Sequence, residues 1–234
     1  MTPVTFAERA AEVGELLATR PLIRTINFHN TPRTRISEIE RQLDRCRRHF
    51  APVNEDDLDV YLRTGSWHQR QPGLIVALYE GYRNHYDVMA PLLERYGFTG
   101  WYFVITGFVG APVPGQLAFA AQHDISTVSG EYPDGRYALS WTELRELDRR
   151  HVIASHARSH TPLNSLDAAA IESEVAGSQQ DFVRHLGHPV RSFVSYSGPA
   201  HGEFALADRW VEAAGYQFVF SNFRIQRLRA WPRA

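Results

Sequence analysis

Residues 72–104 carry the pattern that most restricts the fold of this chain. A Pro-Gly pair opens the short apolar run Leu74–Leu78, which is typical of a buried strand. Apolar residues then recur at helical spacing over Val88–Tyr96, and Gly97 follows where a C-cap glycine is common. The aromatic and β-branched run Trp101–Ile105 predicts a second strand. Strand, helix and strand within about 30 residues form a βαβ unit, so the two strands should be parallel.

The rest of the chain continues this alternation. We expect helices over 33–50, 56–65, 166–186 and 208–214, strands over 190–196 and 216–221, and an amphipathic N-terminal helix over 5–18. The stretch 110–140 contains several glycines and prolines and is predicted as a long loop that covers the mouth of the site. The 234 residues show no internal repeat, so we expect one domain, 1–234, with the α/β architecture of a distorted (β/α) barrel.

Charge and composition restrict the partners. The net charge of −1 argues against nucleic-acid binding, and the single cysteine, Cys46, excludes an intramolecular disulfide framework. The N-terminal residues lack the basic and continuous apolar regions of a signal peptide, and no apolar run of about 20 residues is present to span a membrane. We therefore expect a cytoplasmic protein that meets a small-molecule or amino-sugar substrate. The oligomeric state stays open.

Two histidines suggest a metal site. His156 and His160 stand four residues apart, a spacing that places both rings on one face of a helical turn, within reach of a single ion. The pattern is weak by itself, because a chain with eleven histidines will contain such a pair by chance. A surface pair that binds no metal is the alternative.

The flanking motifs resemble those of the NodB-like polysaccharide deacetylases. Members of that family carry Thr-Phe-Asp-Asp-Gly at the end of a strand, then a helix with a Pro-Ile/Leu-Leu core, then a strand of the type Ala-Thr-Phe-Phe-Val. The corresponding segments here are Ala77–Gly81, Ala90–Leu93 and Gly100–Val104. The second family motif, Ser/Thr-His-x-x-x-His-x-x-Leu, is similar to Ser155–Leu163, and Trp141-Thr-Glu-Leu looks like the helix start that precedes it. The resemblance covers about residues 21–222 and implies the barrel fold of that family.

The resemblance implies a divalent metal held by Glu80, His156 and His160. In the family the second Asp of the first motif and both histidines bind the metal, usually zinc, and Glu80 stands at the Asp position. Two imidazoles and a carboxylate are a known catalytic zinc set, although cobalt, nickel, iron or manganese would suit the same ligands. The alternative is that Glu80 pairs with an arginine and the site binds no metal.

The acid and base residues of the family are replaced. Tyr79 stands where the family has its general base Asp, and a tyrosine ionises near pH 10 against about 3.9 for Asp. Tyr79 is therefore expected to stay neutral and to donate a hydrogen bond or stack on substrate. Gly198 stands at about the place of the Arg of the third family motif, and no histidine follows His201 to serve as the C-terminal acid.

Other residues are predicted to take over these roles. His29 follows a first strand in which Asn27 and His29 share one face, and polar residues at strand carboxyl ends line the site in barrels of this kind. His29 and His201 are the candidate acid/base residues, with structural histidines as the alternative. Trp101, Tyr82 and Tyr196 are the candidate substrate contacts.

Three functions remain open on the sequence. The first is a metal-dependent hydrolase of a non-peptide C–N bond, such as an N-acetyl group on a small molecule or amino sugar. The second is a repurposed member of the fold that catalyses a cyclisation, elimination or isomerisation in a biosynthetic pathway, with Tyr79 as proton donor. The third is an inactive relic that binds a ligand, in which Glu80 would turn away from both histidines.

Overall fold

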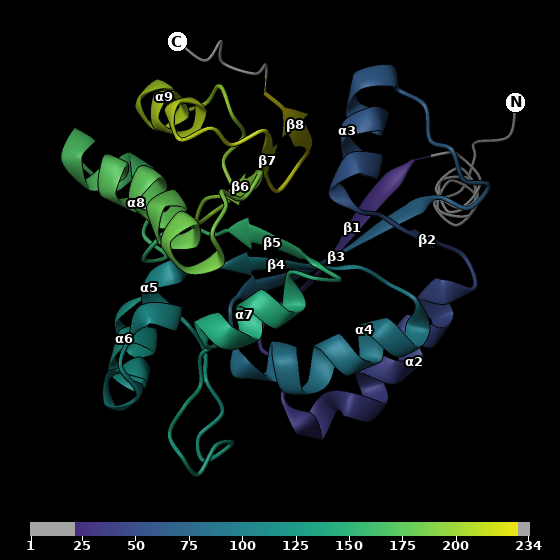
Figure 1. Ribbon diagram of the computed structural model, residues 1–234, viewed down its shortest axis with the longest axis horizontal. Helices are drawn as coiled ribbons and strands as arrows, with labels where there is room; N and C mark the ends of the chain where they lie inside the picture. The colour runs from purple at the N-terminus through teal and green to yellow at the C-terminus, as the bar shows by residue number, and fades with distance from the viewer. Residues whose placement is uncertain (1–21, 229–234) are drawn as a thin grey trace, which may run out of the picture.

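A single curled sheet organises residues 22–228, the part of the chain that the computed structural model describes (Figure 1). Its strands are β1 (Ile23–Phe28), β2 (Ala51–Pro52), β3 (Gly73–Glu80), β4 (Gly100–Val104), β5 (Val152–Ser155), β6 (Ser192–Val194), β7 (Phe218–Phe220) and β8 (Ile225–Arg227). The order is β1-β3-β4-β5-β6-β7-β8, with β2 paired to the start of β3. All pairs are parallel except β7 with β8. The sheet curls into an open half-barrel, which confirms the predicted distorted barrel.

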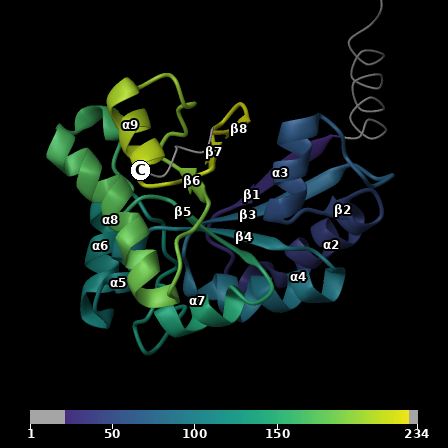
Figure 2. The same ribbon diagram turned by 45° about the horizontal axis from the view of Figure 1, so that its top comes forward.

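Most of the described helices cover the outer face of the sheet. The helices of residues 22–228 are α2 (Ile36–Arg47), α3 (Glu55–Thr64), α4 (Ala90–Tyr96), α5 (Thr106–Gly110), α6 (Gln116–Gln122), α7 (Trp141–Leu147), α8 (Ala168–Leu186) and α9 (Ala205–Ala213). Short 3-10 turns lie at Arg33–Arg35, Val113–Gly115 and Leu163–Ser165. Figures 1 and 2 show α2, α4 and α7 along one side of the sheet and α8 and α9 along another. By contrast, α3 lies beside β1 and β8, at the two ends of the sheet.

Period-2 alternation divides the core in two. Outward side chains of β3, such as Val76 and Leu78, pack with the covering helices in one large cluster. Inward ones, such as Ile75 and Ala77, belong to a second cluster inside the curl, which also contains Phe103. Both faces of the central strands are therefore apolar, as expected for parallel strands buried on two sides.

The βαβ prediction for 72–104 is confirmed, with one local difference. The helix between β3 and β4 begins with a π-helical segment, His85–Met89, before α4, and Gly97 ends it in the left-handed conformation at φ 74°. The expected long loop at 110–140 is partly wrong. It contains α6, which forms because Phe119 and Ala120 pack on a third apolar cluster.

Two further sequence-based predictions concern the N-terminal helix and membrane-spanning segments. The amphipathic helix expected over 5–18 lies outside the described residues. Within residues 22–228, no helix combines the length and apolar character needed to cross a membrane.

Candidate metal centre and its cavity

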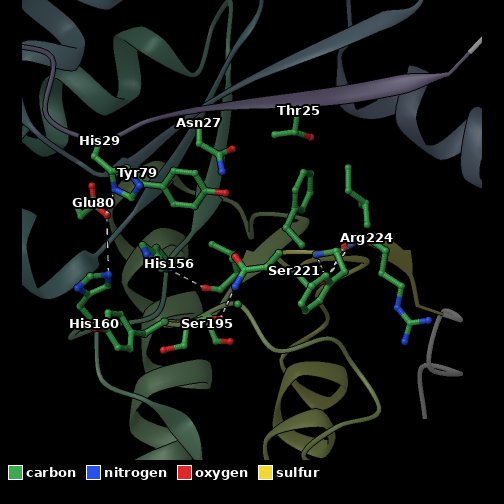
Figure 3. A pocket seen from close by; sticks show the side chains of 18 of the residues that line it. Thr25, Asn27, His29, Tyr79, Glu80, His156, His160, Ser195, Ser221 and Arg224 are labelled. Carbon is green, nitrogen blue, oxygen red and sulfur yellow. Dashed lines mark hydrogen bonds and ion pairs between the residues drawn. The ribbon is translucent and has the colours of Figure 1, made fainter. Parts of the chain in front are cut away.

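Parallel strands bring the candidate ligands to one edge of the sheet. His29 follows β1, Glu80 is the last residue of β3, and His156 follows β5. The carboxyl ends of these strands meet at this edge, which is where active sites lie in barrels of this kind. Figure 3 shows Glu80 facing His160 across the cavity, with His29 beside Glu80 and His156 close by.

Glu80, His156 and His160 are close enough to share one ion. One ligand atom from each lies within 4.8 Å of the others, and the described residues contain no second such group of three His, Cys, Asp or Glu side chains. The Nε2 atom of His160 is 3.9 Å from Oε1 of Glu80. The two imidazole rings have centroids 4.9 Å apart at an interplanar angle of 76°. The structure thus brings together the three side chains that the family resemblance picked out.

The protonation and hydrogen bonding of these residues fit a metal. Nδ1 of His156 donates to the carbonyl of Val194 at 3.1 Å, and Nδ1 of His160 donates to the carbonyl of His123 at 2.8 Å. Each bond leaves an Nε2 lone pair free for a ligand bond, the usual arrangement around a bound metal. Burial lowers the pKa of His156 to about 3, which keeps it neutral. Oε2 of Glu80 is buried without a hydrogen-bond partner, so a cation there would satisfy it.

The expected helical turn between the two histidines is wrong. Both lie in an irregular segment after β5, and Ala157 and His160 adopt left-handed φ values of 61° and 47°. Glu80 is also left-handed, with φ 72°. Non-glycine residues rarely adopt this conformation, and such strain clusters at functional sites. The fold therefore brings the two histidines together, but not through the helical turn that their spacing predicted.

Helix α8 holds this segment in place. The Glu174 carboxylate is 8% exposed and accepts hydrogen bonds from the backbone N–H groups of Arg158, at 3.0 Å, and Ser159, at 2.8 Å. The Arg158 guanidinium donates to both carboxylate oxygens of Asp181 at 3.1 Å. Gly177 makes room, because a Cβ atom there would lie 2.5 Å from this guanidinium. Buried acceptors on α8 thus replace the hydrogen bonds that a helical turn would have made.

His29 contacts the candidate ligand set from β1. Its Nδ1 donates to Oε1 of Glu80 at 2.8 Å, and this hydrogen bond raises the pKa of His29. The His29 side chain is 65% exposed, so its other ring nitrogen is accessible from the cavity. The bond orients the Glu80 carboxylate toward the two histidines.

Two buried residues anchor the turn that carries His29. Nε2 of His85 donates to the carbonyl of His29 at 2.8 Å. The Oδ1 atom of Asn84 accepts from the backbone N–H and the hydroxyl of Thr31, at 3.2 and 3.0 Å. Its Nδ2 donates to Asn30 at 2.6 Å. Both anchors are at most 1% exposed.

Tyr79 cannot replace the missing base of the family. Its ring stacks between His29, at a centroid distance of 5.3 Å, and Phe103, at 5.2 Å. Burial, together with the nearby Glu80 carboxylate, raises the pKa of Tyr79 to about 12. The phenol therefore stays neutral near pH 7 and can donate a hydrogen bond but cannot take up a proton.

The candidate metal centre opens into a cavity of about 700 Å³. Tyr82 and Tyr196, two of the predicted substrate contacts, line it. The Tyr196 ring lies 4.3 Å from the His160 ring, and its hydroxyl donates to Asp124 at 3.4 Å. Thr25 and Asn27 continue the row of His29 along β1 (Figure 3).

Sequence reasoning missed several of these cavity residues. Thr25 shares the period-2 alternation of Asn27 and His29, which could have revealed it. Asp124 and Ser195 follow no local pattern, because segments far apart in the sequence bring them to the cavity.

Two predicted site residues lie elsewhere. Trp101 is fully buried, and its Nε1 donates to the carbonyl of Val53 at 2.8 Å, so it belongs to the inner core and does not contact a substrate in the cavity. His201 lines a different cavity, and its Nε2 lies 3.1 Å from a carboxylate oxygen of Glu212. The candidate acid/base role of His201 is therefore not supported by its position.

The fold agrees with the comparisons to known proteins. The family model for polysaccharide deacetylase matches residues 72–219, more than half of the chain. The chain therefore belongs to the polysaccharide deacetylase family. No curated protein sequence matches it.

Solved structures share the fold at low sequence identity. The Streptococcus pyogenes deacetylase PplD in complex with acetate has a TM-score of 0.66 and 13% identity, covering 87% of this chain and 84% of that one. IcaB from Ammonifex degensii has a TM-score of 0.65 and 17% identity, with the same coverage. The de-N-acetylase from Aggregatibacter actinomycetemcomitans has a TM-score of 0.64 and 13% identity, covering 88% and 90%. At these identities the similarity establishes the fold alone.

Proposed function

We propose that this protein is a metal-dependent hydrolase that cleaves a non-peptide C–N bond, the amide of an N-acyl group on a small molecule or amino sugar. One observation carries the proposal. Two imidazoles, each donating its Nδ1–H to a backbone carbonyl, face a buried carboxylate that lacks a hydrogen-bond partner on one oxygen. Membership of the polysaccharide deacetylase family supports the same reaction class.

In this proposal Glu80, His156 and His160 hold the ion, with zinc as the first choice. A divalent cation held there would supply Lewis-acid chemistry toward an amide carbonyl and toward water. Water adds its oxygen to the acyl carbon, the C–N bond breaks, and the amine leaves with a proton. Beyond the three ligands, the cavity lining includes His29, whose imidazole can accept a proton, and the carboxylate of Asp124. We assign His29 as the base because it contacts Glu80, and Tyr79 as a neutral hydrogen-bond donor.

A repurposed, non-hydrolytic reaction is the second candidate. The observation that favours it is Tyr79, a neutral phenol at the position of the family base. Turnover of a pathway intermediate without cleavage of any N-acyl substrate would support this alternative. An inactive relic is disfavoured, because Glu80 faces both histidines. The cytoplasmic location and the absence of a nucleic-acid or membrane partner stay sequence-based predictions.

The test combines metal analysis with activity. We expect purified protein to bind about one equivalent of divalent metal and to release an amine from N-acyl amino sugars only when loaded. His156→Ala should lose both the metal and the activity. The matched control is His188→Ala, an exposed histidine bonded to Asp148, which should lose neither. Stoichiometric metal binding by His156→Ala would contradict the assignment.

A further inference from the structure

A second cavity, of about 460 Å³, adjoins the candidate metal centre. It lies between the segment after β6, helix α9 and strand β7. Much of its wall is apolar and comes from Leu163, Phe193, Phe204, Ala207, Val211 and Val219. The residues proposed above for the reaction do not line it.

One segment separates the two cavities. Ser195, Tyr196, Ser197 and Gly198 line both of them. The Tyr196 ring packs against His160 at a centroid distance of 4.3 Å. The apolar cavity therefore begins one aromatic ring away from a proposed metal ligand. Ser197 and Gly198 have left-handed φ values of 64° and 56°, which shapes this thin wall.

An exposed aromatic side chain stands at the rim that the two cavities share. Phe223 lies between β7 and β8, lines both cavities and is 86% exposed. It is the most exposed large apolar side chain among the described residues. An apolar group that enters either cavity can therefore pack on the Phe223 ring.

The two cavities differ in polarity, as the amine part and the acyl part of an amide substrate can differ. The larger cavity presents the hydroxyl and amide groups of Thr25, Asn27, Ser221 and Asn222, which suit a polar amine such as an amino sugar. The smaller presents mainly aliphatic and aromatic side chains, although Asn164, Glu203 and Asp208 also belong to its lining. A methyl group would leave most of its volume without apolar contacts. We propose that the substrate is an N-acylated polar amine whose acyl chain is longer than acetyl, and that this chain occupies the smaller cavity.

This inference rests on the proposed function and adds the class of acyl group to it. The reaction needs no further reactant, because water, the acyl carbon and the departing amine balance to a carboxylic acid and a free amine. Each methylene that enters the cavity should raise kcat/KM about three- to fourfold until the cavity is full, as expected for burial of a CH₂ group.

The test uses metal-loaded protein and N-acyl glucosamines with acetyl, butanoyl, hexanoyl and octanoyl chains. We expect the octanoyl-to-acetyl ratio of kcat/KM to exceed about 100. Ala207→Phe, which fills the cavity from α9, should lower that ratio at least about tenfold. Phe223→Ala should lower it less, and it is an exposed change that should not impair folding. Val183→Ala, an exposed site on α8 outside both cavities, is the control and should leave the ratio unchanged.

Calorimetric binding of octanoate separates failure of this inference from failure of the proposed function. If acetyl is the best substrate and octanoate does not bind, the acyl cavity is refuted and the hydrolase stands. If no amide is cleaved but octanoate binds wild type and not Ala207→Phe, the cavity stands and the hydrolase fails. If neither cleavage nor binding is observed, both fail.

Discussion

At the level of single residues, Tyr79 separates this chain from the pattern of its family. It stands directly before the proposed metal ligand Glu80, and its ring is held between His29 and Phe103. Burial and the neighbouring carboxylate raise its pKa to about 12. A side chain that stays neutral cannot act as a general base, so proton uptake must fall to another group in the cavity.

Restoring a carboxylate at position 79 tests this reasoning. Tyr79→Asp should raise cleavage of simple N-acetyl substrates by metal-loaded protein at least about tenfold, since a positioned acid or base contributes about 10²–10⁴-fold. Tyr79→Phe is the control, because it keeps the ring and adds no base. Equal rates for both variants would show that position 79 is not the former base position. The measurement is acetate release at saturating metal.

Asn84 is a second residue whose effect can be predicted. It is 1% exposed and bonds the backbone N–H and the hydroxyl of Thr31. Asn84→Ala leaves these groups without a partner and should lower the free energy of unfolding by roughly 1–3 kcal/mol. Urea denaturation measures the change. Asn164→Ala, at an exposed position, should alter stability by less than about 0.5 kcal/mol.

At the level of elements, the segment between β5 and α8 depends on α8 for its conformation. Left-handed residues at 157 and 160 would not persist without the acceptors that α8 offers to the backbone. The same helix contributes Phe182 and Val175 to the outer core, so the metal site is tied to the main packing of the fold.

Removing the Glu174 carboxylate, which accepts hydrogen bonds from the backbone of the segment after β5, should lower metal affinity although Glu174 is not itself a proposed ligand. Glu174→Ala should lower metal affinity about 10- to 100-fold, as loss of a hydrogen-bond partner behind the ligands commonly does. Competition with a chelator measures it. Glu172→Ala removes the same charge from an exposed position two residues earlier on α8, and it should leave metal affinity unchanged. Equal effects of the two variants would indicate a general charge effect.

At the level of the whole molecule, the half-barrel is stabilised by an outer and an inner apolar cluster. The inner cluster supports the floor of the cavity, because Tyr79 packs on it through Phe103. The sheet order ends at β1 on one side and at β8 on the other. Residues of both ends line the larger cavity, which therefore follows from incomplete closure of the barrel.

Shortening a large side chain of the inner apolar cluster should destabilise the whole fold. Phe218 is fully buried in the inner cluster, and Phe218→Ala should lower the free energy of unfolding by about 3–5 kcal/mol. Leu117→Ala, at a side chain that is 47% exposed, should change it by much less. Urea unfolding followed by tryptophan fluorescence compares the two. Similar losses would mean that the inner cluster contributes little to stability.

Much of this organisation could be predicted from the sequence, because it depends on local patterns. The alternation of apolar runs, helical spacing and glycine caps specified β3, α4 and β4, and the motif residues Glu80, His156 and His160 were identified before any contact was known. The 3-10, π-helical and left-handed segments were not predicted, because their conformations depend on contacts with residues that are distant in the chain.

The sequence by itself determined the parallel α/β architecture, because hydrophobic periodicity is a local property, and its motifs identified the three candidate ligands through their resemblance to those of the deacetylase family. Only the tertiary structure decided that Trp101 is in the core, that His201 lies outside the cavity of the candidate metal centre, and that Asp124 lies inside it. These positions depend on how the sheet curls and on which segments meet at its carboxyl edge. Burial and long-range hydrogen bonds select that arrangement, and neither is encoded by the spacing of neighbouring residues.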